Sequence, residues 1–373
     1  MSTSDHQEFR EDCLAILREQ SEGKRVHRRR FLQAIAALGA VPAGLRFTPA
    51  HAAASEVVVV NWGGDAVPAY DEIWARPFSA ANAGIKAVIN GAGPTSGKIK
   101  AMVESRAVTW DVCDRTMPAS LELGRQNLLE QVDWNIVAYN KLRPAHRSDW
   151  GVGAYLYSFA LTYDREALKG ATPKSWADFW NVKDFPGKRT LRNNIEGMLE
   201  AALMADGVAP DKIYPINVDR ALDKIKQIKQ HTIFWSTGAE SQQLFRNKEV
   251  VMGNLWHTRS MLLAKEVGER IQFTFDQGVL FAGAWIVPKG NPAGPLAWKF
   301  IASAQDPQSQ VELFKRVGNG PINPAASALV PAELKALDCG SPDNFAKQVI
   351  VDAEWYAEHY AAALNRYMDV IAS

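Results

Sequence analysis

The sequence predicts an α/β fold of two lobes, each with a sheet covered by helices. Short β-branched segments alternate with amphipathic helical segments, a pattern typical of parallel sheets. This alternation occurs twice, with one long strand-like segment between the two series. About 320 residues follow residue 54, more than the roughly 250–300 that one hydrophobic core usually organises. We therefore expect two lobes with a cleft between them.

The first series is expected to start with a strand at residues 56–60. This run of valines stops at Gly63 and Gly64, as expected for a strand buried on both faces. A helix is predicted at 66–83, because its large apolar residues recur on one stripe. The series continues with strands at 85–89 and 109–113 and with a helix at 98–107.

The second series follows a long strand-like segment at 154–163, which is long enough to cross between the lobes. Ser175 is placed to cap a helix, with the acidic Asp178 three positions later. A strand near the end of this series is expected to return to the first lobe. The predicted strands lie at 187–191, 249–254, 270–276 and 281–288, and the predicted helices at 175–180, 195–205, 218–230, 240–247, 294–304, 307–317 and 343–369.

The N-terminal 54 residues have the pattern of an export signal. Arg29-Arg30-Phe31-Leu32 fits a twin-arginine address, and Ala50-His51-Ala52-Ala53-Ala54 fits a small-residue cleavage site. The apolar run between them is shorter than the ~20 residues of a membrane-spanning helix. A basic amphipathic surface helix is the alternative. We expect export by a twin-arginine-type signal and a periplasmic location.

Charge and cysteine content narrow the function classes. The formal net charge is +1 at pH 7, so neither nucleic acid nor an anionic membrane is expected as a partner. Cys113 and Cys339 remain after residue 54, and either a disulfide or two buried thiols fits them. The sequence has no CxxC or HExxH pattern, so neither a metal nor a cofactor is expected.

A collinear set of motifs resembles a known family. It includes Pro173-Lys174-Ser175-Trp176-Ala177-Asp178-Phe179-Trp180, Phe185-Pro186-Gly187-Lys188, Met252-Gly253-Asn254-Leu255-Trp256, Ala284-Trp285-Ile286-Val287-Pro288-Lys289 and Gly318-Asn319-Gly320-Pro321-Ile322-Asn323-Pro324. These motifs resemble the periplasmic solute-binding proteins of ABC importers, in the spermidine/putrescine-binding branch (extracellular solute-binding family 1).

The resemblance implies the type II architecture of periplasmic binding proteins. Two lobes close on a solute by a hinge motion, and the loaded protein, expected to be a monomer, delivers the solute to an ABC permease. With the predicted crossing strands, this places residues 55–157 and 283–318 in lobe 1, and residues 158–282 and 319–373 in lobe 2.

Candidate ligand-binding residues of lobe 1 follow its strands. Trp62 either lines the cleft, as the resemblance implies, or packs in the core, and Gly63 allows backbone close to a ligand. Thr95 and Ser96 begin a helix, where they either cap it or help to bind an anion. Arg115 either pairs within the protein or binds a carboxylate, and Thr116 lies beside it.

The candidates of lobe 2 are Asn193, Asn194, Trp256, Arg259 and Phe281. The resemblance implies that Trp256 and Phe281 supply cleft aromatics. Polyamine binders of the family carry acidic residues near Asn193 and Asn194, where this chain has mainly amides. They also carry an aspartate at the position of Gly283.

A desolvated ammonium without a carboxylate is costly. We therefore expect a small anionic or aromatic carboxylate as the solute. The alternative is a polyamine such as putrescine or spermidine, held by Asp114 and Glu196. Tyr356 and Tyr360, four residues apart, are expected to pack in the core rather than bind iron.

An exported enzyme is the other class that we considered. The sequence has no convincing Gly-x-Ser-x-Gly motif, Cys/His pair or GxGxxG motif. His257 is the only histidine expected near the cleft, and a packed imidazole explains it equally well. We expect no catalytic residues.

Overall fold

The computed structural model describes residues 55–142 and 144–373, so the expected export signal at 1–54 lies outside the described residues. Its strands form one ten-stranded sheet. The strands are β1 (Glu56–Val60), β2 (Lys86–Asn90), β3 (Val112–Thr116), β4 (Arg147–Ser148), β5 (Gly151–Asp164), β6 (Arg189–Arg192), β7 (Thr232–Trp235), β8 (Met252–Trp256), β9 (Ile271–Ile286) and β10 (Val349–Ile350).

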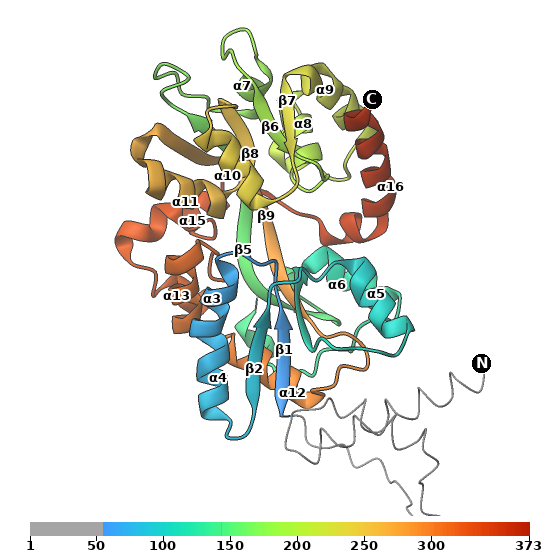
Figure 1. Cartoon of the computed structure of the whole chain (residues 1–373). Coiled ribbons are helices and arrows are strands. Elements are labelled where there is room, and N and C mark those ends of the chain that lie inside the picture. The colour runs from blue at the N-terminus through green and yellow to red at the C-terminus, as the bar shows by residue number, and fades with distance from the viewer. Residues whose placement is uncertain (1–54, 143) are drawn as a thin grey trace, which may run out of the picture. The chain divides into compact units, whose positions relative to one another are not determined.

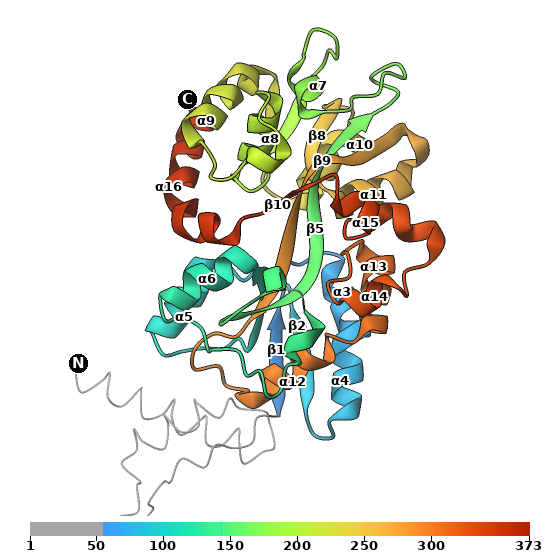
Figure 2. The same ribbon diagram turned by 180° about the vertical axis from the view of Figure 1, so that it is seen from behind.

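Helices cover this sheet (Figures 1 and 2). They are α3 (Ala66–Tyr70), α4 (Arg76–Ala81), α5 (Ser96–Glu104), α6 (Met117–Arg125), α7 (Trp176–Trp180), α8 (Met198–Ala205), α9 (Val218–Ile228), α10 (Gly238–Arg246), α11 (His257–Val267), α12 (Pro295–Ser303), α13 (Pro307–Val317), α14 (Pro324–Ser327), α15 (Pro342–Phe345) and α16 (Ala353–Ala372). A π-helical turn (Asp71–Ala75) joins α3 to α4, so the helix predicted at 66–83 is one continuous helical run.

The sheet is parallel at its two ends and antiparallel in the middle. Its order is β2-β1-β3-β9-β5-β8-β6-β7. β1 pairs in parallel with β2 and β3, and β6 pairs in parallel with β7 and β8. Between these groups, β9 and β5 run antiparallel to each other and to their outer neighbours. Parallel pairing therefore holds for both end groups, and the predicted crossing strands join them into one sheet (Figure 1).

The two middle strands pass from one hydrophobic core to another. On β5, Leu156 packs in a core with Val57 and Trp285, whereas Phe159 packs in a core with Trp176. We call the parts around these two cores the first and the second lobe. The pairing of β5 with β9 is irregular between Gly153 and Tyr155 and between Phe159 and Leu161. These irregularities lie on either side of the passage between the cores.

Several element boundaries differ from the sequence prediction. β3 covers residues 112–116 instead of 109–113, so Asp114, Arg115 and Thr116 form the end of the strand rather than following it. The segments 270–276 and 281–288 belong to one strand, β9. β7 and α11 were not predicted.

The C-terminal helix α16 begins at Ala353, ten residues after the predicted start. The Asp352 carboxylate accepts hydrogen bonds from the backbone N–H groups of Glu354 and Trp355 and so caps this helix. Before it, β10 pairs in parallel with β9 and forms a third connection beside the two long strands. α16 packs against both α6 and α9.

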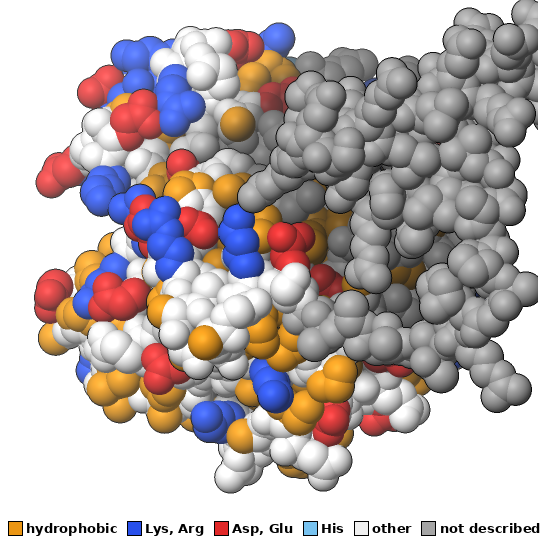
Figure 3. Space-filling view, turned by 60° about the horizontal axis from the view of Figure 1, so that its bottom comes forward, with side chains coloured by type: hydrophobic (Ala, Val, Ile, Leu, Met, Phe, Trp, Pro, Cys, Tyr) orange, Lys and Arg blue, Asp and Glu red, His pale blue; other side chains and the backbone are white. Residues whose placement is uncertain are grey.

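The surface mixes charges of both signs. On the face shown in Figure 3, basic and acidic side chains are interspersed, with hydrophobic side chains gathered between them. Cys113 and Cys339 are both free and buried. Among the described residues, no helix is long and apolar enough to cross a membrane.

Candidate functional site

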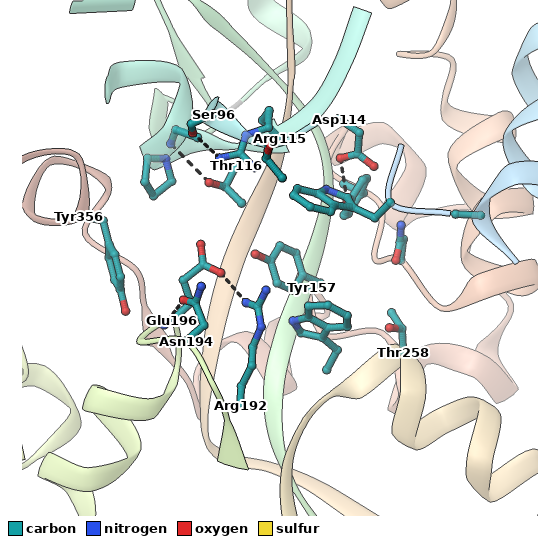
Figure 4. Close-up of a pocket in the computed structure, with 18 of the residues that line it drawn as sticks. Ser96, Asp114, Arg115, Thr116, Tyr157, Arg192, Asn194, Glu196, Thr258 and Tyr356 are labelled. Carbon is teal, nitrogen blue, oxygen red and sulfur yellow. Dashed lines mark hydrogen bonds and ion pairs between the residues drawn. The ribbon is translucent and has the colours of Figure 1, made fainter. Parts of the chain in front are cut away.

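A cavity of about 470 Å³ lies at the ends of strands from both lobes. β3 and the segment after β1 form one wall, while β6, β8 and α11 form the other. Tyr155 and Tyr157 of the crossing strand β5 also line it. In Figure 4, Arg115, Ser96 and Thr116 face Arg192, Glu196 and Asn194 across the cavity, and Tyr157 lies between the two groups.

Trp62 and Gly63 follow β1 on the first-lobe wall. Trp62 is 48% exposed, so it is not a core tryptophan. Gly63 has φ +79°, and a Cβ there would lie 3.1 Å from the Gly91 carbonyl oxygen. A side chain would therefore be strained, and the glycine keeps the backbone close to the cavity.

Arg115 projects from β3 on the same wall. Its Nη2 donates to Ser96 Oγ at 2.9 Å, and its guanidinium lies 5.4 Å from the Trp62 ring centroid. Its Nε is buried and has no hydrogen-bond partner among the described residues. Thr95 and Thr116 also line the cavity, and each caps a helix with its hydroxyl, Thr95 for α5 and Thr116 for α6. The hydrogen-bonding capacity of this guanidinium is therefore incompletely used among the described residues.

Asp114, the neighbour of Arg115, is a buried carboxylate on the cavity wall. Its two oxygens accept hydrogen bonds from the hydroxyls of Tyr70, at 2.9 Å, and Tyr155, at 2.8 Å. Burial raises the pKa of Asp114 to about 7, although both hydrogen bonds and the charge of Arg115 act in the opposite direction. Asp114 therefore titrates near neutral pH and anchors two tyrosines of the site.

Arg192 at the end of β6 is the corresponding arginine of the second lobe. Its Nη1 lies 2.7 Å from Glu196 Oε2, and its guanidinium is 4.9 Å from the Trp256 ring centroid. The Nε of Arg192 and the Nε1 of Trp256 are both buried, and neither has a hydrogen-bond partner in the part of the chain that the structure describes. This wall therefore contains an arginine whose charge is already balanced by a carboxylate.

Arg259 on the first turn of α11 is the third arginine that lines the cavity. Its Nη1 is 4.0 Å from the exposed Asp65 carboxylate, and its buried Nε has no hydrogen-bond partner within residues 55–142 and 144–373. Burial lowers the pKa of Arg259. A Cβ on Gly238 would lie 2.5 Å from this Nε, so the glycine makes room for the guanidinium.

Tyr356 and Tyr360 of α16 line the cavity from the C-terminal end of the chain. The Tyr356 hydroxyl donates to Glu200 Oε1 at 2.8 Å, and that oxygen also accepts from Tyr214 at 2.7 Å. Glu200 is fully buried, its Oε2 has no partner, and burial raises the pKa of Glu200 to about 7. Glu200 thus holds a cavity tyrosine from behind.

The structure gathers most of the predicted site residues on this cavity: Trp62, Gly63, Thr95, Ser96, Arg115, Thr116, Asn194, Trp256 and Arg259. It does not bring Asn193 and Phe281 to the wall. The Asn193 side chain donates to Ser236, and Phe281 is 1% exposed and stacked on Tyr157. Phe281 therefore supports the aromatic wall from inside the core.

Sequence reasoning missed the tyrosines of the site. Tyr155 and Tyr157 are two residues apart on a strand, so they share one face, and this alternation was the available signal. Tyr356 and Tyr360 were expected only to pack in the core. Tyr356 is indeed buried, yet both also line the cavity. Their four-residue spacing fitted core packing and a cavity wall equally well.

His257 lies outside the cavity lining. Its Nδ1 accepts from the Ser158 N–H, so Nε2 carries the proton and donates to the Gly318 carbonyl at 2.9 Å. Burial lowers the pKa of His257 to about 4, so the imidazole is neutral at pH 7. Among the described residues, no group of three or more His, Cys, Asp or Glu side chains is placed to hold a metal ion.

Known proteins resemble this chain along most of its length. Residues 74–337 match the family model of bacterial extracellular solute-binding proteins. A gamma-aminobutyric acid (GABA)-binding protein of Pseudomonas aeruginosa is 33% identical over 323 residues, which cover 85% of this chain and 91% of that protein.

Two solved structures share the fold. The Atu4243 GABA receptor is 35% identical with a TM-score of 0.78, covering 85% of this chain and 98% of that chain. An ABC transporter substrate-binding protein of Bradyrhizobium japonicum is 36% identical with a TM-score of 0.80, covering 85% and 99%. This chain therefore has the two-lobed fold of periplasmic binding proteins and belongs to the bacterial extracellular solute-binding proteins that serve ABC transporters.

Proposed function

We propose that the solute is a small organic carboxylate that also carries an amino group, of the class of GABA. The observation that carries this proposal is the set of three arginines on the cavity wall, Arg115, Arg192 and Arg259, of which Arg115 has no carboxylate partner among the described residues. Guanidinium groups bind carboxylates with paired, charge-assisted hydrogen bonds. The GABA-binding relatives, which match nearly their whole length, support the same class.

The aromatic residues of the cavity fit the carbon chain of such a solute. Trp62 and Trp256 line the cavity on its two walls, and Tyr157 lies between the two charged groups (Figure 4). Apolar surface removed from water contributes about 25 cal/mol per Å², so these rings stabilise the bound state without fixing its orientation. The charged groups supply the orientation. An aromatic carboxylate fits the same walls.

A polyamine remains the second candidate, because Asp114, Glu122 and Glu196 also line the cavity. Two of these carboxylates are already engaged, Asp114 by two tyrosine hydroxyls and Glu196 by Arg192. A diamine would also have to lie beside three guanidinium groups. Because Asp114 and Glu196 are engaged while Arg115 has no carboxylate partner among the described residues, the cavity favours a solute with an acid group.

Isothermal titration calorimetry of the purified protein tests the proposal. We expect binding of GABA, weaker binding of valerate, in which a methyl group replaces the ammonium, and no binding of putrescine or spermidine. Binding of spermidine with no response to any carboxylate would refute the proposal.

We further propose that the protein is exported through its twin arginines and works as a periplasmic monomer that delivers its solute to the permease. Replacement of Arg29 and Arg30 by lysine is expected to retain the protein in the cytoplasm. Export of that variant at the wild-type level would contradict the proposal.

The lobes are proposed to close about the three connecting strands. We place the first two boundaries between the lobes near residues 157 and 283, as the sequence suggested. On β5, Leu156 packs in the first-lobe core and Phe159 in the second-lobe core. We place the third at β10 instead of residue 318, because Ile322 and Cys339 pack in the first-lobe core.

We propose that the solute leaves unchanged, since a transport protein has no reaction to catalyse. Native mass spectrometry of the protein incubated with GABA should recover GABA alone. Release of a chemically altered product would instead indicate an exported enzyme.

A further inference from the structure

The three cavity arginines differ in how their charge is balanced. Arg192 is paired with Glu196 at 2.7 Å, and Arg259 lies 4.0 Å from Asp65. Within residues 55–142 and 144–373, no ion pair joins Arg115 to a carboxylate. Its contacts are the neutral Ser96 hydroxyl and the face of Trp62.

The two acidic groups nearest to Arg115 do not replace such a partner. Both oxygens of Asp114 hold tyrosine hydroxyls, and burial raises the pKa of Asp114 to about 7, so this group is partly protonated at neutral pH. The charge of Arg115 acts on Glu122 of α6, but the two groups form no ion pair among the described contacts. Burial raises the pKa of Glu122 as well.

The surroundings of Arg115 add further donors for an anion. Ser96 is the first residue of α5, a helix of nine residues, so the positive end of the helix dipole lies beside the guanidinium. The buried Nε of Arg115 has no partner. An uncompensated guanidinium, an unused donor and a helix N-terminus therefore meet at one end of the cavity (Figure 4).

We propose that the acid group of the solute docks on Arg115 in the first lobe, beside Ser96, rather than on the balanced Arg192–Glu196 pair. This inference rests on the proposed function, which requires an acidic solute but does not say where the acid is bound. The second lobe then meets the amino end of the solute with a wall that contains both a cation and a carboxylate. The subsite takes a carboxylate or another oxyanion of similar size.

The first test compares GABA with 4-aminobutanamide, which has the same shape and ammonium group but no acid. Calorimetry should show that wild-type protein prefers GABA, and that Arg115→Gln reduces this preference about tenfold or more, since hydrogen bonds to charged groups are the strong ones. Arg115→Lys should keep part of the preference. Arg192→Gln should weaken both ligands by similar factors.

Arg125→Gln is the matched control, because Arg125 pairs with Glu354 at the surface, away from the cavity lining. It should leave the preference unchanged. Loss of the preference in Arg192→Gln together with its retention in Arg115→Gln would overturn the inference. Failure of wild-type protein to bind GABA or any other acid would refute the proposed function instead.

A second test needs no ligand. Removal of an uncompensated charge should stabilise the empty protein, so Arg115→Gln should raise its melting temperature by about 1–3 °C. Arg192→Gln should lower the melting temperature, because Glu196 would lose its partner. An equal decrease in both variants would show that Arg115 is balanced within the protein, and the inference would then fail.

Discussion

The two walls of the cavity contain similar parts but balance their charges differently. Each wall has an arginine facing a tryptophan, Arg115 with Trp62 and Arg192 with Trp256. Each lobe also buries a carboxylate that accepts two tyrosine hydroxyls, Asp114 in the first and Glu200 in the second. Only Arg192 has a carboxylate partner close enough for a strong ion pair. The second wall is thus electrostatically complete, whereas the first leaves a charge to be balanced by the solute.

The largest expected effect comes from replacing Glu200, the buried carboxylate of the second lobe. Glu200→Ala should lower the free energy of unfolding by about 3 kcal/mol, because it leaves a cavity and two buried tyrosine hydroxyls without an acceptor. Glu200→Gln keeps an acceptor and should cost less than about 1 kcal/mol. Urea unfolding measures both, with the exposed Asp211→Ala as control. An equal loss in the Ala and Gln variants would show that packing alone matters there.

The pH dependence of stability tests whether both carboxyls are protonated in the folded state. Burial raises the pKa of Asp114 and of Glu200 to about 7, from ordinary values of 3.8 and 4.5. The folded state therefore binds more protons than the unfolded state between these values, so each group makes the protein more stable at pH 5 than at pH 8. His257 acts in the opposite direction between pH 6.5 and 4, because burial lowers the pKa of His257 to about 4.

Variants that lack one of the two carboxyl groups isolate its contribution to the pH dependence of stability. Glu200→Gln and Asp114→Asn should each reduce the fall in unfolding free energy between pH 5 and pH 8, measured by urea unfolding at both pH values. An unchanged pH slope in either variant would mean that its carboxyl is ionised throughout. That result would show that the two lobes differ in the protonation of their buried carboxyl groups.

Replacement of Trp62 or Trp256 by alanine should weaken solute binding by similar factors. The two replacements should differ in their effect on stability. Trp62→Ala should reduce GABA affinity about tenfold with little change in melting temperature, because Trp62 is 48% exposed. Trp256 packs against Trp235 at 5.1 Å and Phe159 at 6.2 Å, so Trp256→Ala should lower affinity and stability together. Calorimetry and thermal melting distinguish the two. A large stability loss in Trp62→Ala would contradict its assignment to the cavity surface.

The smallest expected effect concerns Asp114 and the solute. Its negative charge lies beside Arg115, so Asp114→Asn should strengthen GABA binding about threefold at pH 8. At pH 5 the wild-type carboxyl is protonated, and the difference should disappear. Calorimetry at both pH values measures the ratio. Weaker binding at pH 8 would indicate that Asp114 holds the ammonium group.

The fold was largely predictable, because alternating valine-rich strands and amphipathic helices encode the parallel groups directly. The middle of the sheet was less predictable from the sequence. β9 was predicted as two segments because Gln277 and Gly278 interrupt its apolar run, and in the structure they lie at the irregularity in the pairing with β5, between Thr274 and Val279. The start of α16 was misplaced because Pro342 begins the short helix α15 and Asp352 caps α16, and local pattern did not separate the two helices.

The candidate site was predictable where it follows the ends of strands. Trp62 and Arg115 were found because they come at or after the ends of predicted strands, and Trp256 was found because the family resemblance implies a cleft aromatic there. The tyrosines of β5 and α16 were not, because a side chain that lies between a core and a cavity has the same sequence pattern as one in the core. Which arginine lacks a partner depends on contacts such as that between Arg192 and Glu196, which sequence spacing alone does not establish.

The irregular pairing on β5 has a mechanical consequence. The interruptions between Gly153 and Tyr155 and between Phe159 and Leu161 are places where the ladder is already broken. Flexure concentrated there would strain few hydrogen bonds and leave both parallel groups rigid. Tyr155 and Tyr157 lie between these two interruptions and also line the cavity. We therefore expect a solute in the cavity to contact β5, through Tyr155 and Tyr157, where its pairing with β9 is interrupted.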